Sequence, residues 1–265
     1  MPATTPEFST LRIDTTANPA VARLVLNRPA RLNALSAELL SELVDACSWI
    51  DSVPDLKVLV VTGEGPNFSA GFDLDDFSGL GESSRDPRST ADLGRRAAEA
   101  LTDVAPLTIA AVRGHCVGGG LVLVAACDLR VAATSTRFAI PEVDLGIPLA
   151  WGGIPRLVRE IGPARTKELV LSCRPFGAEE AASLGVVNRV VDDEAFETAV
   201  AHWAEELSSK PRFSIRTTKS QVNAVMEEMA GTRRNANDAD TLLAALADEE
   251  SRQASRDYLA SRGRR

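Results

Sequence analysis

Apolar and polar residues alternate along the first half of the chain in a way that predicts both strands and helices. Residues 21–26 alternate and residues 58–62 form a short apolar run, so both are predicted strands. Ser36 is a favourable N-cap residue, and apolar side chains recur at helical spacing after it, which predicts a helix over residues 37–49. Further strands are expected at residues 108–112, 128–132 and 186–191, and a further helix at residues 91–104.

Helical patterns dominate the second half of the chain, from Gly153 onward. Residues 235–259 are rich in alanine and charged side chains and predict one amphipathic terminal helix, suited to covering a neighbouring element or a subunit interface. Residues 78–90 hold Gly, Ser, Asp and Pro without periodicity and predict a mobile surface loop. The order of elements therefore predicts an α/β core followed by a helical C-terminal part.

Composition and charge exclude several classes of protein. The chain has 265 residues, of which 45% are hydrophobic, so it can bury a sizeable core. No apolar stretch approaches the ~20 residues that span a bilayer, and the first residues carry no secretion signal, so we expect a cytoplasmic protein without a membrane partner. The net charge of −8 argues against nucleic acid as a partner. Four dispersed cysteines and two histidines predict buried thiols and no metal site.

The sequence partly matches two known motifs, a dinucleotide-binding loop and a nucleophile elbow, but lacks a required glycine in each. Gly63 and Gly65 follow a predicted strand, but a dinucleotide-binding loop needs a third glycine where Phe68 stands. Ser69 does not lie in a nucleophile elbow, because Asn67 occupies the place of a required glycine. The sequence thus argues against dinucleotide binding and against acylation of a serine.

Two loops of small residues remain, and each follows a predicted strand. One comprises residues 69–73, and the other comprises three glycines at residues 118–120 that lead into an apolar helix. Glycines let the backbone approach a ligand closely, because no Cβ intervenes. The first N–H groups of a helix also favour negative charge. Taken alone, the triple glycine is better explained by tight helix–strand packing or by a turn with positive φ.

Together, these loops and several other segments resemble the crotonase family, the enoyl-CoA hydratases and isomerases. Each segment is weak evidence by itself, but their order and spacing cover nearly the whole chain. The matching segments are residues 26–29, 32–35, 68–73, 118–120, 127–130, 138–147 and 181–187. The resemblance implies an α/β fold of the ClpP/crotonase type: a spiral of ββα units at residues 1–195, then a helical trimerisation part at residues 196–265. It also implies a homotrimer or a hexamer built as a dimer of trimers.

The resemblance further implies an acyl-CoA thioester substrate, no separate cofactor, and an oxyanion hole made by the N–H groups of Phe72 and Gly119. Two such donors stabilise the charge that develops on a thioester oxygen, and losing one typically costs about 3–4 kcal/mol. The residues expected to contact coenzyme A or the acyl group are Arg28, Arg31, Asn33, Ala34, Ala70, Phe72, Asp73, Leu74, Gly118, Gly119, Val122, Pro141 and Leu149.

Arg28 and Arg31 are expected to meet the phosphates of coenzyme A, which offsets the acidic net charge locally. Two solvated surface arginines would give the same pattern.

The chain departs from the family's hydratases at one position. Those enzymes use two glutamates; Glu142 matches the second, but Val122 stands where the first is expected. A valine cannot exchange a proton, whereas one carboxylate suffices to move a double bond from C3–C4 to C2–C3. Burial between apolar residues is expected to raise the pKa of Glu142. The dienoyl-CoA isomerases of the family use additional acidic residues. Val122 and Ala150 occupy those positions here, which disfavours dienoyl-CoA isomerisation.

Enoyl-CoA isomerisation, with Glu142 as base and then acid, is therefore the preferred prediction. Hydration by Glu142 alone, or with a second acid such as Asp144, is the first alternative. Another crotonase-type reaction and a non-catalytic acyl-CoA-binding protein are further alternatives. Glu142 could also be a helix N-terminal acid that pairs with an arginine.

Overall fold

The protein is described by a computed structural model over residues 5–79, 86–232 and 237–262, and its strands form two sheets. The larger sheet has the spatial order β1 (Leu11–Thr15), β2 (Val21–Leu26), β3 (Val58–Gly63), β4 (Leu107–Val112), β6 (Leu129–Ala133) and β9 (Arg189–Val191). Only the β1–β2 pair is antiparallel in this sheet. The smaller sheet comprises β5 (His115–Val117), β7 (Arg137–Ala139) and β8 (Phe176–Gly177).

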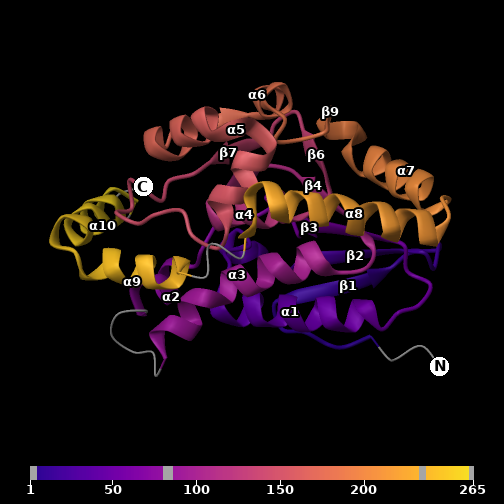
Figure 1. Ribbon diagram of the computed structural model, residues 1–265, viewed down its shortest axis with the longest axis horizontal. Coiled ribbons are helices and arrows are strands. Elements are labelled where there is room, and N and C mark those ends of the chain that lie inside the picture. The colour runs from indigo at the N-terminus through magenta and orange to yellow at the C-terminus, as the bar shows by residue number, and fades with distance from the viewer. Residues whose placement is uncertain (1–4, 80–85, 233–236, 263–265) are drawn as a thin grey trace.

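Helices surround both sheets (Figure 1). In the first two thirds of the chain they are α1 (Ala37–Asp51), α2 (Leu74–Gly79), α3 (Pro87–Asp103), α4 (Gly119–Ala126) and α5 (Gly153–Ser172), with a short 3-10 turn at Pro29–Arg31. The later ones are α6 (Ala178–Leu184), α7 (Phe196–Ser208), α8 (Arg212–Ala230), α9 (Asp238–Ala247) and α10 (Glu249–Arg262), with a second 3-10 turn at Asp193–Ala195. No described helix is both long and apolar enough to cross a bilayer.

The chain repeats one unit, in which a strand of the larger sheet leads into a strand of the smaller sheet and then into a helix. The elements β4, β5 and α4 form one such unit, and β6, β7 and α5 form the next. The segment after β3 joins this stack through single bridges from Ser69 to Cys116 and from Phe72 to Leu35. Three successive turns of the chain are therefore stacked, which is the spiral that the resemblance implies.

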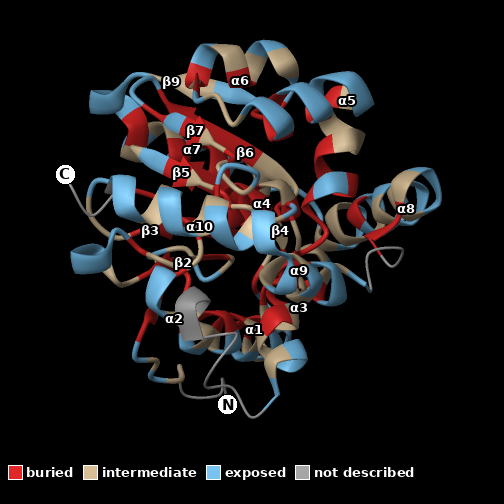
Figure 2. Cartoon of the chain, turned by 90° about the vertical axis from the view of Figure 1, so that its left-hand side faces the viewer, coloured by how far each residue is buried: buried red, intermediate tan, exposed pale blue. Residues whose placement is uncertain are grey.

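Both faces of the larger sheet are buried, which explains the uninterrupted apolar run of β3. Leu59 and Val61 face the main core with α1, α3 and α4. Val58 and Val60 face a second cluster that includes Trp203 of α7. Figure 2 shows the buried residues concentrated on the central strands and the exposed residues on the outer helices. The helix α7 thus packs on the sheet, while the boundary at residues 195 and 196 stays a prediction.

The starts predicted for α3 and β9 and the extent of the predicted loop differ from the structure. The strand β9 begins at Arg189 rather than at residue 186. The helix α3 begins at Pro87 rather than at residue 91, because Asp86 caps it by accepting a hydrogen bond of 3.1 Å from the Ser89 N–H. The first turn, residues 87–90, has no buried residue, so the apolar pattern that predicted this helix begins only at Ala91. Residues 78 and 79 belong to α2, and residues 80–85 of the expected loop lie outside the described chain.

The terminal segment forms two helices instead of the single predicted one. Asp248 has extended backbone at the end of α9, and its carboxylate accepts a hydrogen bond of 2.9 Å from the Ser251 N–H in the first turn of α10. A side chain that caps the second helix therefore breaks the first one.

Candidate functional site

The loop that holds Phe72 is fixed on both sides by backbone hydrogen bonds. The Leu35 N–H donates to the Gly71 carbonyl at 2.8 Å, and the Val117 N–H donates to the Ser69 carbonyl at 3.0 Å. Gly71 has a φ of +92°, and a Cβ there would lie 2.9 Å from the Val117 carbonyl oxygen. Only glycine meets both conditions, so the sequence sets the position of the Phe72 backbone closely.

The glycines at the start of α4 bring a second stretch of backbone to the same place. Gly118 has a φ of +51°, and its N–H donates to the Ala139 carbonyl of β7 at 2.9 Å. Gly119 is the first residue of α4, so its N–H has no acceptor within the helix. A Cβ on Gly118 would lie 2.3 Å from Oε1 of Glu142, so the missing side chain makes room for this carboxyl group.

Glu142 follows β7 by three residues and directs its carboxyl group inward. Its Oε2 is buried without a hydrogen-bond partner among the described residues, although the residue as a whole is partly exposed. Because burial penalises the charged form, the pKa of Glu142 rises from 4.5 to about 7. The predicted rise is therefore present, and near neutral pH this group both releases and accepts a proton readily. No arginine pairs with it in the described structure, so the pairing alternative fails.

Phe72, Gly119 and Glu142 line one small cavity of about 40 Å³. Val122 and Leu149, two of the expected contacts, also line it. The remaining lining residues are Ile147, Pro148, Ala150, Trp151 and Leu242. Glu142 is the only acid among these described lining residues, and Asp144 is exposed and not one of them. The structure thus brings the three expected catalytic residues together and leaves the suggested second acid outside.

Trp151 and Leu242 are lining residues that the sequence did not indicate. Trp151 is 7% exposed, and its ring meets that of Phe72 edge-on, with centroids 5.4 Å apart. Leu242 comes from α9, which packs beside α3 more than 100 residues earlier in the chain. No local motif marks either position. Trp151 has a φ of +62° and is followed by two glycines, but this unusual backbone conformation is visible only in the structure.

The residues expected to contact coenzyme A gather around Asp73. Oδ2 of Asp73 lies 2.8 Å from Nη1 of Arg28, and Oδ1 lies 3.4 Å from Nη2 of Arg31. Arg31 also pairs with Asp75. Burial opposes the charge of Asp73, but the hydrogen bond and charge of Arg28, together with the other contacts, hold its pKa below the usual value. Of the two arginines, Arg31 is the more exposed, at 53% against 21% for Arg28, and is the better placed to meet a phosphate.

The other expected contacts divide into buried and open positions. Asn33 is fully buried, and its side-chain N–H groups donate to the carbonyls of Glu64 and Asn67 at 2.9 and 2.8 Å, so this side chain holds loops together. Ala34, Ala70 and Pro141 are partly exposed, and Leu74 is 41% exposed. Contacts from these residues to coenzyme A stay predictions.

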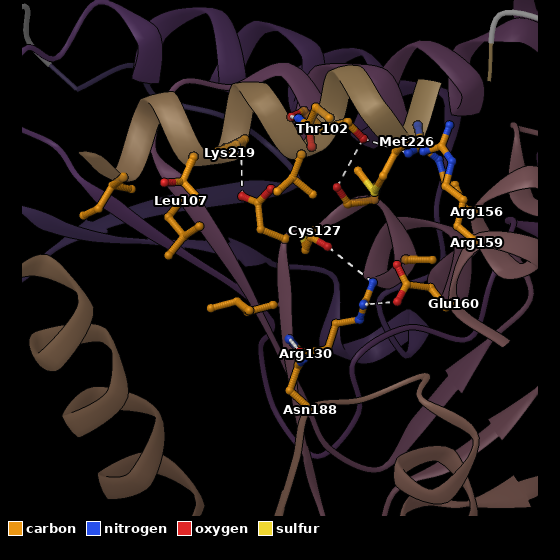
Figure 3. Close-up of a pocket in the computed structure, with 18 of the residues that line it drawn as sticks. Thr102, Leu107, Cys127, Arg130, Arg156, Arg159, Glu160, Asn188, Lys219 and Met226 are labelled. Carbon is orange, nitrogen blue, oxygen red and sulfur yellow. Dashed lines mark hydrogen bonds and ion pairs between the residues drawn. The ribbon is translucent and has the colours of Figure 1, made fainter. Parts of the chain in front are cut away.

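A larger cavity, of about 670 Å³, lies elsewhere, between α8 and the body of the protein (Figure 3). No expected catalytic residue lines it. Two of its buried charges are paired: Lys219 lies 2.7 Å from Asp128, and Arg130 lies 2.7 Å from Glu160. Arg156 is buried too and donates to the Thr102 hydroxyl at 2.8 Å, but it brings no group that could act as a base near neutral pH. Size alone therefore does not mark the candidate active site; the isolated Glu142 carboxyl group does.

Comparison with known proteins places the chain among enzymes of one family. The sequence profile described as Enoyl-CoA hydratase/isomerase matches residues 16–263. The chain is 35% identical to a crotonyl-CoA hydratase of Syntrophomonas wolfei over 208 residues, which are 78% of this chain and 79% of that protein. It is 34% identical over 212 residues, 76% of each chain, to a peroxisomal Delta(3,5)-Delta(2,4)-dienoyl-CoA isomerase of Arabidopsis thaliana.

The fold comparison agrees. The crystal structure of an enoyl-CoA hydratase/isomerase from Xanthobacter autotrophicus Py2 has a TM-score of 0.85 at 27% identity, covering 97% of this chain and 98% of that one. This chain is thus an α/β protein of the crotonase fold with a helical C-terminal part, as predicted. It belongs to the enoyl-CoA hydratase/isomerase family. The relatives named above include a hydratase and a dienoyl-CoA isomerase, so the names do not favour one reaction.

Proposed function

We propose that the protein is an enoyl-CoA isomerase that moves a double bond from C3–C4 to C2–C3 of a coenzyme A thioester. The observation that carries this proposal is the single carboxyl group of the cavity, Glu142, with the apolar Val122 where a hydratase of the family has a second glutamate. Addition of water to a double bond is helped by two groups that hold and activate the water. Transfer of one proton between two carbons of the substrate needs only one.

The proposed reaction proceeds in two proton transfers. The Glu142 carboxylate removes a proton from C2, the electrons of that C–H bond form a C1–C2 double bond, and the π electrons of the thioester carbonyl move onto its oxygen, which gives a conjugated dienolate. The N–H groups of Phe72 and Gly119 are proposed to donate to its oxygen. The same carboxyl group then returns the proton to C4, so the C3–C4 double bond is lost and a C2–C3 double bond remains. A pKa of about 7 suits a group that acts as base and then as acid.

Hydration of a 2-enoyl-CoA is the second candidate, and the likeness to a crotonyl-CoA hydratase favours it. It would use Glu142 alone, because the other described residues that line the cavity carry no acid. Dienoyl-CoA isomerisation is less well supported, since Val122 and Ala150 are both apolar cavity residues. Assembly as a trimer or hexamer stays an expectation from the family resemblance, and a cytoplasmic location stays an expectation from the apolar pattern of the sequence.

One assay discriminates between the candidates. Purified protein is incubated with 3-enoyl-CoA and 2-enoyl-CoA thioesters of the same chain length. The products are separated by chromatography and identified by mass spectrometry. Isomerase activity converts the 3-enoyl thioester to an isomer of equal mass, and the 2-enoyl thioester gains no water. Accumulation of the 3-hydroxyacyl thioester from the 2-enoyl substrate at a comparable rate would favour hydration. Saturable binding of both thioesters without turnover of either would support a non-catalytic acyl-CoA-binding protein.

A further inference from the structure

The indole ring of Trp151 is wedged between two helices at the candidate active site. A Cβ built on Gly94 of α3 would lie 1.9 Å from Cδ2 of Trp151. A Cβ built on Gly119 of α4 would lie 2.3 Å from Cζ3 of the same ring. Contacts this short leave no room for any side chain at either glycine. The chain therefore has glycine at both helix positions that face this ring.

The backbone of Trp151 is strained as well. Its φ of +62° lies in the left-handed region, which bulky residues rarely adopt and glycine adopts freely. The next residue, Gly152, has a φ of +71°, so the turn places two successive residues in this region. Such strain persists only where the surroundings hold it, and it is often found at functional sites. A large ring at a position that favours glycine calls for a role beyond filling the core.

The ring leaves little free space beside the catalytic residues. Trp151 meets Phe72 at an interplanar angle of 77°, and Val122, Leu149 and Leu242 complete this apolar wall. The cavity that remains, about 40 Å³, is only a few times the ~10–15 Å³ that one water molecule needs. Pockets for larger ligands usually measure ~300–1,000 Å³. A long acyl chain that entered here would collide with the indole.

We propose that Trp151 limits the acyl length of the substrate and selects short-chain enoyl-CoA thioesters over medium- and long-chain ones. This inference rests on the proposed function, because it assumes that an acyl-CoA thioester binds with its acyl group in the Glu142 cavity. Trp151 acts on specificity by occupying space and takes no part in proton transfer.

Binding of saturated thioesters tests the inference without requiring turnover. Butanoyl-, hexanoyl- and octanoyl-CoA are titrated calorimetrically into the parent protein and into the Trp151→Ala and Trp151→Leu variants. Each methylene buried in an apolar pocket strengthens binding about fourfold. The parent protein should gain nothing between butanoyl- and octanoyl-CoA. In Trp151→Ala the ratio of octanoyl to butanoyl affinity should rise roughly 10- to 100-fold, and Trp151→Leu should lie between.

Trp203→Phe is the matched control, because Trp203 is 5% exposed on the opposite side of the larger sheet. It should keep the affinity ratio of the parent protein. If Trp151→Ala does not fold, as judged by circular dichroism, the Trp151→Leu ratio decides. A parent protein that binds octanoyl-CoA much more tightly than butanoyl-CoA, or folded variants that keep the parent ratio, would overturn the inference.

Turnover of 3-butenoyl- and 3-octenoyl-CoA by the same proteins separates this inference from the proposed function. A shift of the binding ratio without isomerisation of either thioester would refute the proposed reaction and uphold the role of Trp151. Isomerisation with an unchanged ratio would refute only the role of Trp151. If no coenzyme A thioester binds at all, both fail.

Discussion

Asp73 and Glu142 are two inward-facing carboxyl groups in neighbouring parts of the molecule, and their surroundings shift their pKa values in opposite directions. Asp73 has two arginines within ion-pair distance, and its pKa is lowered. Glu142 has an unpartnered buried oxygen, and its pKa is raised to about 7. Burial acts on both groups in the same sense, so the ion pairs make the difference. A paired carboxylate holds loops in place, whereas an isolated one is free to exchange protons at neutral pH.

The largest effect is expected from Glu142→Gln. The amide keeps the shape of the carboxyl group but cannot shuttle a proton, so kcat should fall by at least roughly a thousandfold. Affinity for a saturated acyl-CoA should change little. Stopped assays with a 3-enoyl-CoA, alongside calorimetric binding, measure both quantities. Full activity in the variant would remove Glu142 from the mechanism.

The pH dependence of the reaction should report the same carboxyl group. Because the first step needs the carboxylate, kcat/KM should fall about tenfold for each pH unit below about 7, and should level off above it. A rate profile from pH 5 to 9 on the parent protein measures this. An inflection near 4.5, the ordinary value for glutamate, would show that the carboxyl group is solvated when the enzyme works.

The contributions of Glu142 and Asp73 to the free energy of unfolding should depend on pH in opposite directions. The raised pKa of Glu142 favours the folded state most below pH 4.5, and this contribution is lost as the pH rises to about 7, by up to about 3 kcal/mol. Glu142→Gln should therefore gain stability over the parent protein between pH 5 and 8. Denaturant unfolding at several pH values measures the difference. A constant difference across that range would contradict the burial of this carboxyl group.

Asp73→Asn should behave in the reverse way. The lowered pKa of Asp73 stabilises the fold above the ordinary aspartate value of 3.8, and that stabilisation is lost as the pH falls through the folded-state value. The variant should lose about 1–3 kcal/mol of unfolding free energy at pH 7 and less near pH 3. Denaturant unfolding of both proteins at the two pH values gives the comparison. Equal stability at pH 7 would mean that the arginine pairs contribute nothing net.

The smallest change is expected from Val122→Glu, which adds a second carboxyl group to the cavity that holds Glu142. Two acids can hold a water between them, so hydration of a 2-enoyl-CoA should rise about tenfold above the parent rate. The new group also repels Glu142, so the pair should titrate at two separate pKa values. Product analysis and a rate profile measure these effects. No hydration in a stably folded variant would mean that neighbours such as Leu149 also restrict water.

The sequence predicted the chemistry of the site better than its shape. Gly71 and Gly118 mark places where backbone must approach backbone or carboxylate, and this requirement is visible as glycine in the chain. Glu142 between apolar residues likewise indicated burial and a raised pKa. The ion pairs of Asp73 were not predicted, because Arg28 and Arg31 meet it only after the 3-10 turn and the loop before α2 have folded together.

Other features depended on contacts between distant segments. Gly94 has no meaning in the pattern of α3 until Trp151, 57 residues later, is placed against it. The start of α3 was missed because its first turn, residues 87–90, has no buried residue, and the break before α10 depends on one capping carboxylate. Periodicity detects apolar side chains at regular spacing, so it fails where a helical turn buries none of them and where a capping side chain sets a boundary.

Leu242, which forms part of the cavity wall beside Glu142, belongs to α9 and is synthesised late. During synthesis, β4, β7 and α4 leave the ribosome long before α9, so the carboxyl group of Glu142 first stands in a core that is open on one side. Its proton affinity should then be nearer that of a solvated acid. Under the proposed function, the nascent protein should therefore gain a Glu142 suited to proton transfer only when α9 docks, which would couple the onset of catalysis to completion of the fold.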